Sequence, residues 1–287
     1  MSRPSAFSRG GIHSFKTTTM VISRTSAQDC PADKDKSWSY NPNFSNGPSH
    51  WSELYPNCKG KSQSPINIVI EHVSNQKGHQ ILKLNGYNIH LYGSRIENNG
   101  HTIVLTPIDG IKRSLDLDNV KYNLESLHFH WGNLTTEGSE HKFDNWSTVM
   151  EGHFVHRNDK GEIAVVGVRF RVVHKQNLRA LDRILSVRDQ YLYKDEEYEG
   201  YIDQLSLNDF VRNGSKVYRY NGSLTTPPCT ENVTWLMTTP SKYIGKSQME
   251  GFFSLYSVKR FTKDIEKCHL INNFRPIQPL NGRKVFS

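Results

Sequence analysis

Two short stretches carry histidines at spacings that suit metal binding. His128 and His130 are separated by one residue, and His153 follows in a second stretch beside Glu151. In an extended strand, residues two apart project from the same face, so His128 and His130 would point the same way. A neighbouring strand would supply His153, with Glu151 and Val155 on the same face. Three histidine ligands leave one position of a tetrahedral zinc ion open, as in catalytic zinc sites.

A pair of histidines in a strand is, by itself, more often a surface feature or part of a satisfied core. The four cysteines stand at positions 30, 58, 229 and 268, and none forms a Cys-x-x-Cys pair. Cysteine-ligated zinc is therefore disfavoured. Four cysteines allow three pairings, and their spacing does not choose among them.

Net charge is concentrated at the N-terminus. The 36 basic and 28 acidic residues of the 287-residue chain give +8. Residues 1–28 contain Arg3, Arg9, Lys16 and Arg24 and no acid, so half of the net charge lies there. Nucleic-acid binding is disfavoured, because it needs a basic surface on the folded body.

The chain ends suggest a tail followed by one domain. We expect residues 1–35 to form a basic tail, disordered or targeting, and residues 36–287 to form the domain. The tail is rich in Ser and Arg, as mitochondrial transit peptides are, and lacks the apolar core of a secretory signal. No apolar run is long enough for a transmembrane segment. Asn-x-Ser/Thr sequons mildly favour a secretory route and occur at Asn43, Asn133, Asn145, Asn213, Asn221 and Asn232.

Strand patterns outnumber helix patterns. Short apolar or alternating runs bounded by turn residues predict strands at 81–84, 89–92, 102–105, 115–117, 163–173, 216–220 and 233–237. Helices are predicted at 178–185, from apolar residues at helical spacing, and at 247–255, with Ser247 as cap and Glu250 completing a capping box. These elements predict a β-rich α+β protein.

Several separate motifs, in order, give the region from about Trp38 to Phe286 a family resemblance. They are Asn46-Gly47-Pro48 with His50-Trp51, Gln63-Ser64-Pro65-Ile66-Asn67-Ile68, Asn98-Asn99-Gly100-His101, His128-Phe129-His130-Trp131-Gly132, Gly138-Ser139-Glu140-His141, Glu151 with His153 and Val155-His156, Gly222-Ser223-Leu224-Thr225-Thr226-Pro227-Pro228, Phe274-Arg275-Pro276 and Gln278-Pro279-Leu280. Together they resemble an α-class carbonic anhydrase of the secreted type. The resemblance implies a large, mostly antiparallel twisted sheet with short peripheral helices.

The same resemblance implies an activity and its metal. One Zn²⁺ per chain would be held by His128, His130 and His153, and zinc-bound hydroxide would hydrate carbon dioxide reversibly to bicarbonate and a proton. Carbonic anhydrases are themselves the standard example of zinc lowering the pKa of a bound water to about 7. Primary sulfonamides and anions would inhibit. The alternative is a non-catalytic relative that uses the fold for binding or as matrix.

Further residues take roles by the same resemblance. Glu151 would accept the other ring N–H of a zinc ligand, most simply that of His153. Ser126 stands where relatives commonly have Gln, so we expect His128 to be held less firmly. Thr225 would accept from the hydroxide and donate to Glu140.

The substrate pocket and the proton route are also implied. Because carbon dioxide is uncharged, its pocket should be apolar, and the matching positions are Val155, Val165, Leu224, Thr225, Thr226, Val233 and Trp235. His101 matches the proton-shuttle position, for which an imidazole of ordinary pKa is suited. Tyr40 and Asn99 match residues that order the water chain, and Val104 replaces a residue that is often polar.

Cys58 and Cys229 match the disulfide of secreted and membrane-attached relatives. Their pairing would tie the loop of Thr225 to the early part of the domain and implies an oxidising compartment. Cys30 and Cys268 have no settled role and would pair with each other or stay free. We expect secretion, with mitochondrial import as the alternative suggested by the tail.

Overall fold

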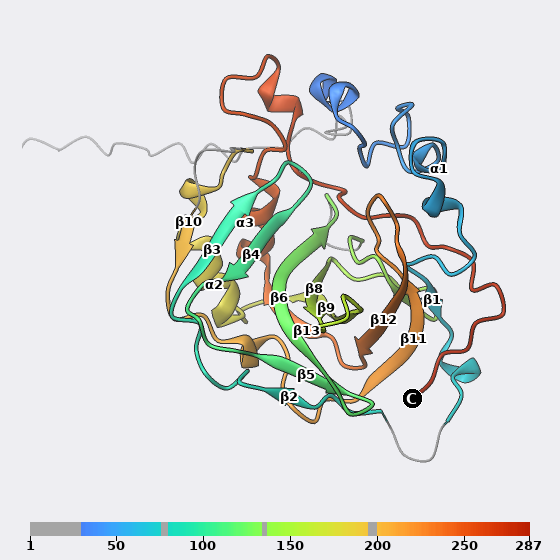
Figure 1. Ribbon diagram of the computed structural model, residues 1–287. Helices are drawn as coiled ribbons and strands as arrows, with labels where there is room; N and C mark the ends of the chain where they lie inside the picture. The colour runs from blue at the N-terminus through green and yellow to red at the C-terminus, as the bar shows by residue number, and fades with distance from the viewer. Residues whose placement is uncertain (1–29, 76–79, 134–136, 195–199) are drawn as a thin grey trace, which may run out of the picture.

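The computed structural model describes residues 30–75, 80–133, 137–194 and 200–287. A large mixed sheet crosses the molecule (Figure 1). Its main path runs through β10 (Gly200–Ile202), β3 (Ser94–Asn98), β4 (Ile103–Pro107), β6 (Val120–Trp131), β8 (Met150–Arg157), β9 (Ile163–Val173), β12 (Glu231–Thr238) and β11 (Val217–Ser223). Outside this path, β13 (Lys242–Gly245) pairs with β9, and β5 (Ser114–Leu117) joins β6 to β2 (Leu84–Asn85).

Most strand pairs in this sheet are antiparallel. Among the described pairs of this sheet, only those of β9 with β12 and with β13 are parallel. A second, two-stranded sheet joins β1 (Asn67–Ile68) to β7 (Lys142–Phe143). The expected β-rich α+β class, with a mostly antiparallel central sheet, is confirmed.

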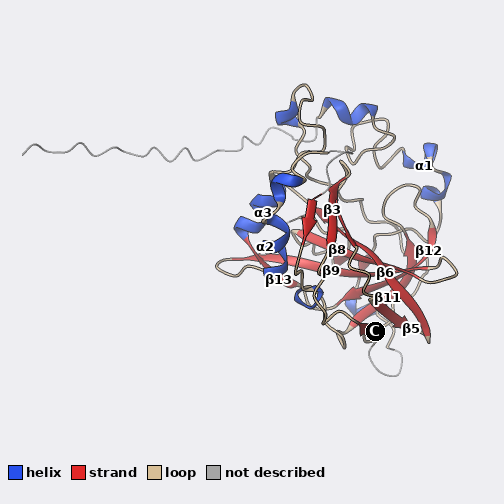
Figure 2. Ribbon diagram, turned by 60° about the vertical axis from the view of Figure 1, so that its left-hand side comes forward, coloured by secondary structure: helices blue, strands red, loops and turns tan. Residues whose placement is uncertain are grey.

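Helical segments are short. The α-helices are α1 (Trp51–Leu54), α2 (Arg179–Leu185) and α3 (Lys246–Phe253). The 3₁₀ turns are η1 (Pro31–Asp35), η2 (Pro56–Lys59), η3 (Ile70–His72), η4 (Arg188–Gln190), η5 (Leu207–Asp209) and η6 (Ile265–Lys267). Helices α2 and α3 lie together beside the sheet (Figure 2), and their buried residues belong to the larger hydrophobic core.

Strand alternation separates the two faces of the sheet. In β6, Leu127, Phe129 and Trp131 enter the larger core, which α2 and α3 cover. His128 and His130 therefore project from the opposite face, because successive side chains of a strand alternate. A smaller core, which includes Val165 and Trp235, lies on that second face. The histidines thus stand on a face backed by one hydrophobic core and flanked by another.

Strand β9 occupies the predicted range 163–173. Residues 164–170 are buried and Arg171 is exposed, which agrees with an apolar first half followed by a wetter second half. Because β8 pairs along one side of β9 and β12 and β13 along the other, both of its edges are satisfied.

Three local predictions were wrong. Of residues 81–84, only Leu84 lies in a strand, β2, and Ile81 makes an isolated bridge with Lys216. Residues 89–92 form no strand, and Leu91 makes only an isolated bridge with Leu205. The nearest strand is β3, which begins at Ser94. It was not predicted because Arg95 and Glu97 alternate with its buried residues, so it contains no apolar run. Helix α3 begins earlier than predicted, after Gly245. Gln248 rather than Glu250 accepts the cap N–H, at 3.1 Å.

Residues 30–35 were expected in the tail but are folded. Cys30 is buried and forms a disulfide with Cys268. The turn η1 follows directly. These residues are therefore joined to the domain. Sequence reasoning placed them in the tail because a covalent link to a distant segment leaves no trace in local composition.

Candidate metal centre and active site

The pairing of β6 with β8 brings the three histidines together. His128 lies directly opposite His153, and His130 lies opposite Glu151. Cross-strand neighbours share a face, so all four side chains project from the same side of the sheet. One nitrogen from each histidine lies within 4.8 Å of the others. The structure therefore brings the three rings together, as their spacing predicted.

The geometry of these nitrogens fits zinc. Nδ1 of His153 lies 3.3 Å from Nε2 of His128. Two nitrogens that each lie about 2.0–2.1 Å from a tetrahedral zinc are separated by roughly 3.3–3.4 Å. Nε2 of His130 is buried and has no hydrogen-bond partner among the described residues. A buried polar atom of this kind needs a partner, and a metal ion supplies one.

The protonation of the rings also suits a cation. Burial, reinforced by the neighbouring histidines, lowers the pKa of His128 well below its ordinary value. Burial likewise lowers the pKa of His130 to about 3 and lowers that of His153 despite the opposing Glu151. Neutral imidazoles are the form that binds metals.

Hydrogen bonds orient two of the three rings. Nδ1 of His130 donates to the carbonyl of Asn273 at 2.7 Å, which leaves the lone pair on Nε2. Nε2 of His153 donates to Glu151 at 2.7 Å, which leaves the lone pair on Nδ1. Both lone pairs belong to the atoms that converge, so these bonds select the tautomers that bind a metal. Within the described chain no hydrogen bond joins Ser126 to His128.

Glu151 is the centre of a buried hydrogen-bond network. Its Oε1 also accepts from Nδ1 of His141 at 2.7 Å, and its Oε2 accepts the backbone N–H of His141 at 2.9 Å. Nε2 of His141 then accepts from the Tyr220 hydroxyl at 2.6 Å, which is 2.7 Å from the Ser64 hydroxyl. Burial would raise the pKa of Glu151, but electrostatic attraction and hydrogen bonds from the His141 and His153 rings lower it well below its ordinary value.

His141 also groups with Glu151 and His153 as a second set of possible ligand atoms. These atoms already satisfy one another through hydrogen bonds, so the set orients the metal centre rather than forming another. Sequence reasoning missed this role. The signal was present, because His141 follows Glu140 within one of the family motifs.

Glu140 and Thr225 meet as expected. The Thr225 hydroxyl hydrogen-bonds to the Glu140 side chain, and the backbone N–H of Arg275 donates to Oε1 of Glu140 at 2.8 Å. Oε2 of Glu140 is buried, lies 3.6 Å from Nε2 of His130, and has no hydrogen-bond partner in the described part of the chain. Burial raises the pKa of Glu140 well above its ordinary value, although Arg275 and Thr225 oppose the rise. A dication nearby would favour the carboxylate.

The apolar residues predicted for the substrate pocket lie together in the structure. Val165, Val233 and Trp235 are buried in the smaller core, and Val155 and Leu224 pack against it. The ring of Trp235 lies 4.8 Å from that of His153 between centroids. This apolar wall therefore contacts a predicted metal ligand.

His101, predicted for the proton route, lies in a partly buried site. Its ring stacks on Trp38 with centroids 3.8 Å apart. Burial, then the charges of Lys36 and Lys194, lower its pKa to about 3. Tyr40 lies nearby, and burial raises the pKa of its phenol well above its ordinary value.

The other two residues named for the proton route are placed as follows. Asn99 accepts the N–H groups of His101 and Thr102 through its side-chain oxygen, each at 2.9 Å, so it shapes the turn. Val104 lies directly opposite His128 in the β4–β6 pair. A side chain without hydrogen-bonding groups therefore adjoins the metal centre at this position.

Both cysteine pairs are oxidised. Cys58 is bonded to Cys229, as the resemblance implied, and Cys30 to Cys268. The N–H of Cys229 donates to the carbonyl of Thr226 at 2.8 Å. The first disulfide therefore ties the loop that carries Thr225 and Thr226 to the turn η2.

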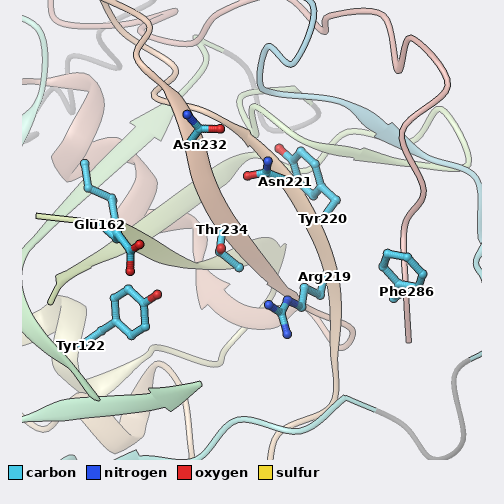
Figure 3. A pocket seen from close by; sticks show the side chains of 9 residues that line it. Tyr122, Glu162, Arg219, Tyr220, Asn221, Asn232, Thr234 and Phe286 are labelled. Atoms are coloured by element: carbon cyan, nitrogen blue, oxygen red, sulfur yellow. The ribbon is translucent and has the colours of Figure 1, made fainter. Parts of the chain in front are cut away.

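A separate cavity of about 570 Å³ is not lined by any of the three histidines. Figure 3 shows Glu162 and Tyr122 facing Arg219 and Thr234 across it. Arg219 is paired with Asp118, and Glu162 accepts from the Asn158 amide at 2.6 Å. Its charged groups are therefore already satisfied, and we assign it no ligand.

Known proteins give an independent comparison. Residues 46–287 match the family model of the eukaryotic-type carbonic anhydrases. The chain is 35% identical over 266 residues to carbonic anhydrase 7 of Mus musculus, covering 86% of this chain and 96% of that protein. It is 35% identical over 257 residues to putative carbonic anhydrase 3 of Caenorhabditis elegans, with coverages of 86% and 96%. It is 32% identical over 264 residues to carbonic anhydrase 6 of Mus musculus, with coverages of 86% and 80%.

A zinc-fitting histidine cluster on this sheet, together with that match, defines the class. The chain belongs to the eukaryotic-type carbonic anhydrases, which are zinc-dependent enzymes. None of the helices in the described ranges is both long and apolar enough to cross a membrane.

Proposed function

We propose that this chain catalyses the reversible hydration of carbon dioxide to bicarbonate and a proton, with one zinc ion per chain. The observation that carries the proposal is the convergence of three neutral histidine nitrogens beside an apolar wall and a buried Thr225–Glu140 pair. When bound, zinc acts as a Lewis acid and makes a hydroxide nucleophile available at neutral pH.

The histidines would hold the ion through Nε2 of His128, Nε2 of His130 and Nδ1 of His153. Because all three ligands are neutral, they leave the charge of the ion intact. Glu151 and the Asn273 carbonyl keep the ring tautomers correct. An ionised ligand in their place would reduce the Lewis acidity of the centre.

Thr225 and Glu140 would select what binds in the open position. The Thr225 hydroxyl would donate its hydrogen bond to Glu140. The Thr225 oxygen could then only accept a hydrogen bond, which requires a ligand with a proton to donate. This arrangement orients the nucleophile and rejects ligands without a proton. The apolar wall of Val155, Val165 and Trp235 suits a substrate without charge.

Zinc content and stopped-flow hydration test the proposal together. We expect about one zinc per chain, hydration that a primary sulfonamide blocks, and loss of both zinc and hydration in His130→Ala. A sulfonamide fits because its anionic nitrogen can bind the metal while its N–H donates to Thr225. A folded, zinc-loaded protein that does not hydrate carbon dioxide would refute the activity and favour a binding or matrix role.

We further propose that the protein is secreted and glycosylated. Two buried disulfides are typical of proteins from oxidising compartments. The sequon residues Asn43, Asn133, Asn145, Asn213, Asn221 and Asn232 are all exposed. The mitochondrial alternative depends only on the composition of residues 1–29, which lie outside the described ranges. Mass spectrometry of the mature N-terminus and of glycopeptides from cells would decide, and a free Cys58 thiol would contradict secretion.

A further inference from the structure

The loop of residues 258–267, which we call the tip loop, is fixed at its base. Figure 1 shows it at the top of the molecule beside η1, with η6 inside it. The disulfide Cys30–Cys268 joins its base to η1, and the backbone N–H of Ser257 donates to the Cys268 carbonyl at 2.8 Å. Val258 packs with both half-cystines in a small hydrophobic cluster. The tip loop is therefore held by a covalent bond and by a core of its own.

Phe261 lies at the end of the tip loop with its side chain in solvent. The N–H of Thr262 donates to the carbonyl of Lys259 at 3.1 Å, which closes a turn with Arg260 and Phe261 as its central residues. Phe261 is 94% exposed, and the next most exposed large hydrophobic side chain in the described ranges is Trp146 at 73%. The cluster at the base of the loop does not include Phe261. The fold thus presents this ring to solvent on a closed turn.

Positive charges surround Phe261. Lys259, Arg260 and Lys263 are exposed. The stretch 259–263 contains no acidic residue, so its three cations give it a charge of +3. A lone exposed apolar residue is common on protein surfaces and needs no explanation. An apolar ring held on a turn among charges of one sign is a different feature, because it combines hydrophobic and electrostatic binding at one point.

The shape of this tip favours a lipid surface over a protein groove or a charged polymer. No residue of the tip loop lines the cavity of Figure 3 or the small cavity beside His101, so the tip is a projection rather than a receptor. Segments that bind bilayer interfaces bury apolar side chains about 5–10 Å into the boundary of headgroups and acyl chains, and their Lys and Arg contact anionic headgroups. A polyanion would use the cations but leave the ring in water.

We propose that the tip loop docks the protein on bilayers that contain anionic lipids. Phe261 would enter the bilayer interface, and Lys259, Arg260 and Lys263 would contact the anionic headgroups. Binding should be weak and reversible, because one ring and three cations provide much less than a transmembrane helix or two lipid anchors. The inference goes beyond the proposed function and does not rest on it, since lipid binding is measured without any turnover.

Sedimentation of the full-length chain with large unilamellar vesicles is the most direct test. One set of vesicles is phosphatidylcholine alone, and the other is phosphatidylcholine and phosphatidylserine in equal parts. In about 0.1 M salt, we expect the parent protein to bind the mixed vesicles and not the neutral ones. Phe261→Ser should weaken this binding about tenfold, and Phe261→Trp should retain it, because Trp suits bilayer interfaces. Trp146→Ser removes another strongly exposed aromatic ring and is the matched control.

Two double variants of equal charge test the cations. Lys259→Gln with Lys263→Gln should weaken binding to the mixed vesicles by at least about tenfold, because each cation near an anionic surface contributes about fivefold. Lys121→Gln with Lys160→Gln removes the same charge from two exposed positions elsewhere. Lys121 lies near the start of β6, and Trp131 at the opposite end of that strand donates to a carbonyl just after the tip loop. This second pair should change binding by less than about twofold, because distant charges are screened.

The variants decide the outcome, because residues 1–28 also carry four cations and no acid. A parent protein that does not bind the mixed vesicles would overturn the inference. So would equal binding by the parent and Phe261→Ser, or equal losses in the two double variants. Retention on heparin beads without vesicle binding would assign these cations to a polyanion instead. Far-UV circular dichroism checks that each variant is folded, so a loss of binding can be assigned to the changed side chain.

Discussion

At the scale of single residues, the metal centre is marked by buried atoms that lack partners. Nε2 of His130 and Oε2 of Glu140 are both buried, and neither has a hydrogen bond within the described chain. The remaining atoms of the same side chains are satisfied, Nδ1 of His130 by the Asn273 carbonyl and Oε1 of Glu140 by the Arg275 N–H. Since an unsatisfied buried polar group costs about 1–3 kcal/mol, this pattern identifies the atoms that a metal ion and its bound ligand would complete.

The Thr225 hydroxyl has the sharpest residue-scale prediction. Thr225→Val keeps the shape of the side chain and removes the hydrogen bond to Glu140. We expect kcat/KM for hydration to fall by about 10²-fold, the usual loss when a preorganised hydrogen-bonding group is removed, while zinc content stays at one per chain. Stopped-flow assays and elemental analysis measure the two quantities. Thr230→Val, an exposed change in the same loop, is the control, and unchanged turnover in Thr225→Val would refute the role.

At the scale of elements, one strand register decides the site. The β6–β8 pairing sets His128 against His153 and His130 against Glu151. A slip of β8 by one residue would turn His153 and Glu151 to the opposite face, away from His128 and His130. Loops contribute other side chains, and specific contacts hold these loops in place.

The loop that carries Thr225 is anchored by Cys58–Cys229. Cys58→Ser with Cys229→Ser should lower the free energy of unfolding by about 2–4 kcal/mol and also lower kcat, because the loop loses its tie to η2. Thermal denaturation and hydration assays measure the two effects. Cys30→Ser with Cys268→Ser is the comparison, since that pair should affect stability without lowering kcat/KM. An equal loss of kcat/KM in the two double variants would contradict a specific role for Cys58–Cys229 in positioning the loop of Thr225.

The connection between β4 and β5 is held by a buried ion pair. Asp109 and Arg113 lie 2.9 Å apart with nearly buried side chains, and hydrogen bonds from Arg113 lower the pKa of Asp109 to about 2. Because the folded-state pKa lies below the ordinary value, this stabilisation is complete above about pH 4 and is lost as pH falls toward 2.

Asp109→Asn should therefore lower the free energy of unfolding by about 2 kcal/mol at pH 7. The difference from the parent protein should shrink toward zero near pH 2. Urea denaturation over this pH range measures it, with the exposed Asp159→Asn as a control. A difference that does not depend on pH would show that lost packing, rather than charge, is responsible.

At the scale of the whole molecule, the metal centre lies between two hydrophobic cores. One core fills the face covered by α2 and α3, and the other packs beside the histidines. The fold therefore does not depend on the metal for its core, unlike small zinc domains that unfold without it.

Removal of zinc should accordingly leave the chain folded but less stable. After dialysis against a strong chelator, we expect unchanged far-UV circular dichroism, a lower Tm, and recovery of both Tm and hydration when zinc is added back. Calorimetry with and without zinc measures the shift. Unfolding of the metal-free protein at 25 °C would contradict the expectation that the two hydrophobic cores keep the chain folded without zinc.

The sequence by itself determined the spacing of the ligands and the run of motifs around them. A two-residue step in a strand fixes a common face whatever the rest of the fold does, so the three histidines and Glu151 could be predicted from local geometry. Strand β9 could also be predicted from the sequence, because a long run of apolar and β-branched residues favours a buried strand over other structures. The pairing of Cys58 with Cys229, in contrast, came from family resemblance and not from spacing.

Only the tertiary structure decided contacts between residues distant in sequence. The Asn273 carbonyl reaches His130 across 143 positions, and a backbone carbonyl leaves no trace in residue type. The Cys30–Cys268 disulfide drew part of the presumed tail into the domain. The surroundings of His101 are likewise tertiary, since its ring stacks on Trp38, and burial with the charges of Lys36 and Lys194 lowers its pKa. A pKa depends on burial and on charges brought close by folding, neither of which a motif records.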